Sequence, residues 1–236
     1  MSSPTTLICL PFAGAGPLFY RPWQALAAPD LDVFAPPMPG RERLLDQPLP
    51  GSVPEAADQV LPAAAERARA APVVLFGHCF GGLVAFELAR RLAETPGARV
   101  LRLVISGTAA PRAPRQAVAG LDDNGLVALV EELAGYRHPA LRHPEMRSLI
   151  MPVLRADLEM AERYAYGSAG PLDVPLTVLR GDRDAFVARA ETTGWAAETT
   201  VGTEFAELPG DHMYVVDNAA AVLDLVRAAV GRAVPS

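Results

Sequence analysis

Cysteine is scarce in this sequence, with only Cys9 and Cys79 among 236 residues. Two cysteines do not make the disulfide framework of a small secreted domain, and Cys9 falls in an expected buried strand. The sequence also contains no Cys-x-x-Cys pair and no His-Glu-x-x-His stretch of the kind that holds a metal ion. We therefore expect a cytoplasmic protein that uses neither a metal nor an organic cofactor of its own.

The sequence has no excess of basic residues and no long apolar run. Its 21 lysines and arginines are outnumbered by 27 acidic residues, which gives a formal net charge of −6. Nucleic-acid binding requires a concentrated positive surface, whereas the arginines here are scattered along the chain. A membrane-spanning helix needs about 18 or more apolar residues in succession, and no such run occurs. We expect a protein that binds neither nucleic acid nor a membrane.

Half of the residues are hydrophobic, and they occur in short runs that alternate with amphipathic stretches. The runs that predict strands are 5–10, 31–35, 72–76, 100–106, 174–180 and 203–208. Helices are expected over 20–28, with Trp23 and Leu26 pointing inward, over 56–70, after residue 79, and over 219–229. Strands separated by helices of this length favour parallel crossovers. The sequence thus predicts an α/β fold, with a mostly parallel sheet covered on both faces, in one domain of residues 1–236.

The junction between the third strand and the helix that follows it indicates a reactive site. The strand run ends in Gly77-His78-Cys79-Phe80-Gly81 and becomes helical at once, without a polar loop. This is the pattern of a nucleophile elbow, in which a tight turn presents one reactive side chain, here Cys79. The N-terminus of the following helix stabilises both a thiolate and an oxyanion. The alternative is that the glycines only allow close packing and that Cys79 is a small buried hydrophobe.

A glycine-rich loop, Pro11–Pro17, follows the first strand. It lacks both the Lys-Ser/Thr ending of a phosphate-binding loop and the spacing of a dinucleotide-binding loop. Elbow hydrolases take one oxyanion-binding N–H from such a loop and the other from the residue after the nucleophile. Ala13 and Phe80 are therefore the candidate donors. A plain turn, chosen for flexibility, is the alternative interpretation of the loop.

Two later strand ends carry an acid and a histidine. Asp182 and Asp184 follow the fifth strand, and His212 follows the sixth. Together with Cys79 they give the order nucleophile, acid, histidine that α/β-hydrolases share. Asp184 is preferred as the acid because it lies past the turn that Asp182 caps.

The other histidines and acids are less suitable. His78 adjoins the nucleophile, and its side chain should leave the elbow in a different direction. His138 and His143 lie in an insertion away from the sheet edge. Asp211 precedes His212 directly, so its side chain is poorly placed to orient that ring. His212 is therefore the expected base.

The strand-helix alternation stops between about residues 108 and 172. Asp122-Asp123 predicts the start of a helix that ends at Gly135, with an apolar face formed by Leu126, Leu129, Val130 and Leu133. A second helical stretch covers about 144–166, and Pro152 is expected to kink it. An insertion of this size indicates a lid over the functional edge of the sheet, with ordinary packing helices as the alternative.

Together these segments resemble the stand-alone type II thioesterases that accompany polyketide synthases and nonribosomal peptide synthetases. The resemblance covers nearly the whole chain. It is carried by Pro11–Gly16, Gly77–Gly82, Pro152–Asp157, Gly181–Asp184 and Gly210–His212. The Pro-x-Leu-Arg-Ala-Asp stretch of the insertion is the most specific of these, since the elbow fits any α/β-hydrolase.

The resemblance implies an enzyme that hydrolyses acyl thioesters on the phosphopantetheine arm of acyl or peptidyl carrier proteins, which dock near the lid. A monomer is the default expectation, and the sequence leaves the oligomeric state open. The resemblance also implies a triad of Cys79, Asp184 and His212, and an oxyanion hole from the N–H groups of Ala13 and Phe80. Cys79 departs from the family pattern, which has serine. An acyl group on Cys79 is still a thioester and reacts readily with amines and thiols. Acyl transfer, cyclisation or amide formation is therefore the alternative, and a non-catalytic carrier-binding module is a third hypothesis.

Overall fold

The computed structural model describes residues 4–134, 141, 143–167 and 170–233. Within them one sheet has the strand order β2-β1-β3-β4-β5-β6, and every neighbouring pair of strands is parallel. The strands are β1 (Thr5–Leu10), β2 (Leu31–Phe34), β3 (Val73–His78), β4 (Val100–Ser106), β5 (Leu176–Gly181) and β6 (Thr203–Leu208). The central strand β3 is buried along its whole length because a parallel sheet is covered on both faces.

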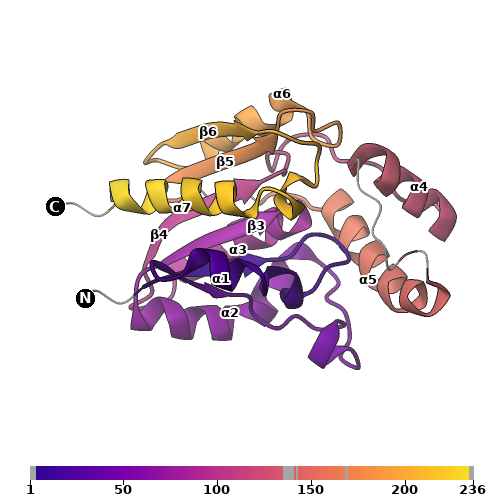
Figure 1. Ribbon diagram of the computed structural model, residues 1–236, viewed down its shortest axis with the longest axis horizontal. Helices are drawn as coiled ribbons and strands as arrows, with labels where there is room; N and C mark the ends of the chain where they lie inside the picture. Colours follow the sequence, from indigo (N-terminus) through magenta and orange to yellow (C-terminus); the bar gives the residue numbers. More distant parts are fainter. Residues whose placement is uncertain (1–3, 135–140, 142, 168–169, 234–236) are drawn as a thin grey trace.

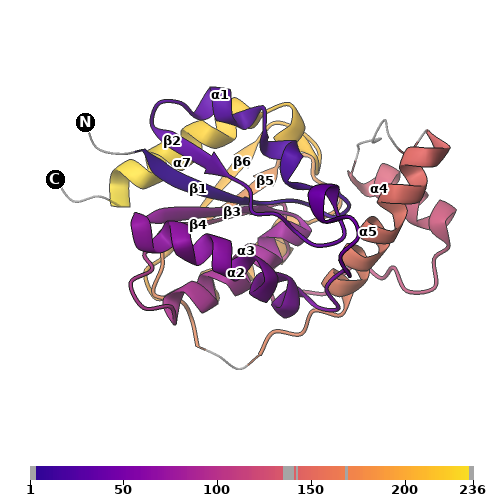
Figure 2. The ribbon, with the colours of Figure 1, turned by 90° about the horizontal axis from the view of Figure 1, so that it is seen from below.

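Helices cover the two faces of the sheet, as Figure 2 shows. On one face lie α1 (Trp23–Ala27) and α7 (Ala219–Ala233), and on the other lie α2 (Val53–Ala70) and α3 (Phe80–Ala93). Two further helices, α4 (Asp123–Ala134) and α5 (Pro144–Glu162), lie beyond the carboxyl ends of the strands (Figure 1). Short helical segments complete the described chain: η1 (Pro17–Tyr20), η2 (Glu42–Leu44), α6 (Arg189–Thr192), η4 (Thr193–Glu198) and η5 (Tyr214–Val216).

The sheet separates two hydrophobic cores, each with a buried tryptophan. Trp195 packs against Phe86 of α3, with ring centroids 5.1 Å apart, and its indole N–H donates to the carbonyl of Thr108 at 2.8 Å. Trp23 packs against Phe76 of β3 on the other side, with centroids 5.3 Å apart. Each ring removes a large apolar area from water, and aromatic pairs add about 0.5–1.5 kcal/mol beyond that burial.

The expected strands all form, and the expected helices differ mainly at their ends. α2 begins at Val53 rather than near Ala56 because the Ser52 side chain accepts a hydrogen bond from the Glu55 N–H at 3.2 Å and caps the helix. The prediction that Leu26 points inward is wrong, since it is 46% exposed. The helix is only five residues long, and the preceding η1 supplies the buried Tyr20 instead.

The insertion forms the two expected helices at the edge of the sheet. α4 begins at Asp123 as predicted, whereas its expected end at Gly135 lies outside the described residues. α5 continues through Pro152 and ends at Glu162, four residues before Tyr166. Across the described part of the chain, no helix combines the length and apolar composition that crossing a membrane requires.

Candidate active site

Cys79 lies at the turn between β3 and α3, in a backbone conformation that few side chains adopt. Its φ is 54° and its ψ is −120°. Hydrogen bonds hold the turn on both sides: the Cys79 N–H donates to the Ser106 carbonyl at 2.9 Å, and the Thr108 hydroxyl donates to the Cys79 carbonyl at 2.9 Å. The side chain is thereby fixed at the carboxyl edge of the sheet.

The glycines that flank the elbow are required by close backbone approach. A Cβ on Gly77 would collide with the carbonyl oxygen of Gly81, and a Cβ on Gly81 would collide with the carbonyl oxygen of Leu10. Glycine is the residue that allows strand, helix and loop to meet at such separations. The same contacts bring the start of α3 next to the end of β1, from which the glycine-rich loop emerges.

His212 and Asp184 form a buried pair beside Cys79. His212 Nδ1 lies 2.9 Å from Asp184 Oδ2, and the two side chains are almost fully buried. The other carboxylate oxygen, Oδ1, accepts hydrogen bonds from the N–H groups of Phe186 and Val187, both at 2.9 Å. Arg180 holds this loop by donating to the carbonyls of Asp184 and Val187 at 2.8 Å. The carboxylate therefore has one oxygen for the backbone and one for the imidazole.

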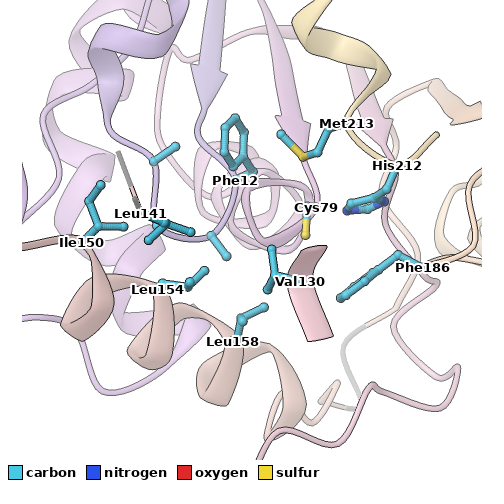
Figure 3. Close-up of a pocket in the computed structure, with 13 residues that line it drawn as sticks. Phe12, Cys79, Val130, Leu141, Ile150, Leu154, Leu158, Phe186, His212 and Met213 are labelled. Atoms are coloured by element: carbon cyan, nitrogen blue, oxygen red, sulfur yellow. The ribbon is translucent and has the colours of Figure 1, made fainter. Parts of the chain in front are cut away.

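The electrostatic environment favours a protonated His212. Burial by itself lowers the pKa of His212, but the charges of the Cys79 sulfur and the Asp184 carboxylate outweigh it and raise the pKa to about 10. His212 Nε2 is buried and has no hydrogen-bond partner among the described residues. Figure 3 shows the ring beside the Cys79 sulfur. An imidazolium in this place suits a thiolate nucleophile.

His78 lies behind this pair and stays neutral. Its Nδ1 is 2.9 Å from the Ser106 hydroxyl, which lies 2.6 Å from the Tyr214 hydroxyl. Burial, together with the charge of His212, holds the pKa of His78 well below its ordinary value. Its ring centroid is 5.0 Å from that of His212. His78 thus turns toward β4 and supports the site from within, while His143 lies exposed at the start of α5 and His138 falls outside the described residues.

Of the two expected oxyanion donors, Phe80 follows Cys79 directly and Ala13 lines a cavity that Cys79 also lines. Phe80 is the first residue of α3, so its N–H has no partner within the helix. Ala13 lines the same cavity as Cys79, in the loop after β1. Within the described part of the chain, neither N–H donates to another protein atom. Both groups therefore stay candidate oxyanion donors.

Two cavities meet at Cys79. The first is apolar, with Ile150, Leu154 and Leu158 from α5 and Val130 from α4 in its wall (Figure 3). The second includes the charged side chains Arg115, Glu162 and Glu191 in its wall. The sulfur therefore lies between an apolar and a more polar space. No cluster of three metal-ligating side chains occurs among the residues described.

The remaining strand-end acids have structural partners, and that of Asp182 lies in another loop rather than in the turn it was expected to cap. Asp182 accepts a hydrogen bond from the Gly210 N–H at 2.8 Å, which ties the loop after β5 to the loop after β6. Asp211 pairs with Arg183 at 3.3 Å, and the carboxylate that contacts His212 is that of Asp184.

Two contributions to the site were missed in the sequence. The ring of Phe186 stacks on His212, with centroids 4.7 Å apart. Arg41 and Asp157 form a buried ion pair next to the glycine-rich loop. Asp157 ends the Pro152–Asp157 stretch that carries the family resemblance, so the signal for it was present. Nothing in the sequence singles out Phe186 or the arginine that Asp157 binds.

Comparison with known proteins identifies the family of this fold and site. A model of the thioesterase domain matches residues 5–230. The chain belongs to the thioesterase family. Thioesterase PikA5 of Streptomyces venezuelae is 32% identical over 217 residues, which are 92% of this chain and 77% of that protein. The gramicidin S biosynthesis protein GrsT of Aneurinibacillus migulanus is 28% identical over 218 residues, or 90% of this chain and 83% of that protein.

Solved structures of this thioesterase family have the same architecture. The type II thioesterase BorB from the borrelidin biosynthetic cluster superimposes with a TM-score of 0.87 at 33% identity, covering 98% of this chain and 94% of that one. The α/β-hydrolase fold class expected from the sequence is confirmed, as is the similarity to type II thioesterases of polyketide and nonribosomal peptide biosynthesis.

Proposed function

We propose that this chain hydrolyses acyl thioesters carried on the phosphopantetheine arm of acyl or peptidyl carrier proteins, through a triad of Cys79, His212 and Asp184. The observation that carries the proposal is the buried His212–Asp184 pair, 2.9 Å apart, beside a cysteine at the N-terminus of α3. A relative named as a thioesterase and a relative named for gramicidin S biosynthesis support the substrate class.

The proposed chemistry has two steps. The Cys79 thiolate attacks the thioester carbonyl carbon, and the N–H groups of Ala13 and Phe80 bind the oxyanion. The C–S bond to pantetheine breaks, and the imidazolium of His212 gives its proton to the departing thiolate. His212 then takes a proton from water, the hydroxide attacks the acyl-Cys79 carbonyl, and the free acid leaves as the Cys79 thiolate reforms. Asp184 keeps the imidazole in the productive tautomer throughout.

The two cavities at Cys79 offer room for the substrate on either side of the sulfur. The apolar cavity under α4 and α5 suits an acyl chain, because its lining offers aliphatic contact. In this proposal residues 108–172 act as the lid of a single domain, and the carrier docks beside it. No cofactor is required, since the reacting thioester arrives on the carrier.

Intact-protein mass spectrometry of the chain mixed with an acetyl- or propionyl-loaded carrier protein tests this proposal. We expect the carrier to lose its acyl group while the enzyme mass is unchanged at steady state, and His212→Ala to reduce the rate by at least about 1,000-fold. Absence of turnover and of acylation on any carrier or small thioester would contradict the proposal and favour a binding module.

Acyl transfer is a second candidate, and Cys79 itself favours it. A thioester acyl-enzyme reacts with amines and thiols faster than an oxygen ester does. If one acyl group accumulates on Cys79 in the same experiment, hydrolysis is slow and an acceptor is expected. Adding amines, alcohols or thiols should then give a transfer product. Release of the free acid alone in their presence would argue against this candidate.

A further inference from the structure

A buried ion pair joins the lid helix to a segment far from it in the sequence. Arg41 lies just before η2, and Asp157 lies in α5. Arg41 Nη2 is 2.8 Å from Asp157 Oδ1, and Arg41 Nη1 is 3.0 Å from Oδ2, so the contact is bidentate. The two side chains are 5% and 0% exposed. This contact cannot be a solvated surface pair.

The same two side chains also hold the glycine-rich loop after β1. Asp157 Oδ2 accepts a hydrogen bond from the Gly14 N–H at 2.9 Å, and Arg41 Nη1 donates to the Ala15 carbonyl at 2.7 Å. The loop therefore has a donor and an acceptor fixed immediately after Ala13. Leu154, one turn before Asp157, packs against Gly14 from the same helix. We call the Arg41–Asp157 pair with its two bonds to the loop the loop clamp.

We propose that Arg41 and Asp157 are positioning residues for acyl transfer, because the loop clamp aims the Ala13 N–H at the oxyanion next to Cys79. This inference rests on the proposed function. Neither side chain lines a cavity at Cys79, so they act through the loop and not on the substrate. Oxyanion binding depends on donors fixed before the reaction begins, and such a clamp fixes one of the two.

A purely structural role would have different consequences. Buried ion pairs can be replaced by apolar side chains of similar volume without loss of stability. A double variant, Arg41→Met with Asp157→Leu, can therefore keep α5 packed on the loop while it removes both bonds to Gly14 and Ala15. If the pair serves packing alone, the double variant should react like the wild type.

The test compares two reactions of Cys79. Alkylation by iodoacetamide needs the Cys79 thiolate but forms no oxyanion. Acylation by an acyl-pantetheine thioester needs the thiolate and also forms an oxyanion that must be stabilised. We expect Asp157→Asn and the double variant to lower the acylation rate by about 100-fold, close to the effect of losing one oxyanion donor. The alkylation rate should stay within about twofold of the wild-type rate. Circular dichroism and thermal unfolding identify which variants remain folded.

Asp123→Asn is the matched control. Asp123 also pairs with an arginine of α5, Arg155, at 2.6 Å, but that pair is exposed and does not contact the loop. Its acylation and alkylation rates should both equal those of the wild type. A folded double variant that acylates at the wild-type rate would overturn the inference, as would a parallel loss of acylation and alkylation. A wild type that is alkylated but never acylated would overturn the proposed function first.

Discussion

At the scale of single residues, the backbone strain at Cys79 is linked to the charge on His212, because the strained turn places the sulfur beside the imidazole. A positive φ at a non-glycine residue is unfavourable, and the bonds to Ser106 and Thr108 maintain it. The turn holds the sulfur beside an imidazole whose Nε2 has no hydrogen-bond partner in the described structure. The sulfur therefore contributes to the raised pKa of His212.

Removing the sulfur should lower that pKa. Burial already lowers the pKa of His212, and in Cys79→Ala only Asp184 remains to oppose it. We expect the His212 imidazole to titrate well below the value of about 10 in the intact protein. An NMR titration of the imidazole C–H signals measures the difference. An unchanged titration would show that Asp184 alone sets the pKa.

The raised pKa of His212 also determines the direction in which the stability of the fold changes with pH. Because the folded state binds the His212 proton more tightly than the unfolded chain does, the stabilisation is complete below about pH 6.5. It is lost as the pH rises toward 10. Urea unfolding at pH 6.5 and at pH 9.5 should therefore show a larger loss of stability in the wild type than in His212→Gln.

The sequence predicted that Cys79, Asp184 and His212 lie together because each follows a strand, and parallel strands bring their carboxyl ends to one edge. It could not identify Arg41 in the same way. Arg41 and Asp157 are 116 positions apart, and a buried ion pair leaves no periodic signal in either segment.

At the scale of elements, two neighbouring faces of α5 contribute to the site. Asp157 turns to the glycine-rich loop, while Leu154 and Leu158 line the apolar cavity. Those leucines also belong to a small core with Leu126 of α4. The residues that hold the insertion together thus also shape the apolar cavity at Cys79.

Filling the apolar cavity should shift the acyl preference. Leu158→Phe adds volume to the wall near Cys79, so we expect kcat/KM for long acyl chains to fall by about tenfold, with short chains less affected, as a clash of 1–3 kcal/mol implies. Competition assays with acyl thioesters of graded length provide the measurement. Leu149→Phe is the control, because Leu149 lies on α5 but is 48% exposed and outside the cavity. Equal effects of the two substitutions would contradict this prediction.

The elements themselves were predictable where the pattern was long and periodic, as in β3 and α3. The short α1 was harder because five residues do not define a helical face, and the inward placement of Leu26 was wrong for that reason. The helical turns at 189–198 were missed, although they place Trp195 in the core, because no apolar period marks so short a segment.

At the scale of the whole molecule, the two tryptophans report on opposite faces of the sheet. Trp23 and Trp195 are both buried, in different cores that share the strands between them. A single cooperative domain requires both cores to melt together. We expect Trp23→Phe and Trp195→Phe, each with one remaining tryptophan, to give fluorescence transitions that coincide with the transition seen by circular dichroism of the same variant. Separate midpoints within one variant would indicate two folding units.

The loop clamp has a further consequence for the order in which the protein forms. Its Gly14–Asp157 bond joins positions 143 residues apart, so it cannot close until β1 and α5 have both been brought to the sheet edge. The contacts of β3 with β1 and β4 span shorter loops and do not depend on the clamp. Amide hydrogen exchange at Gly14 should therefore be faster than in β3. We therefore expect the sheet to form before the loop clamp closes.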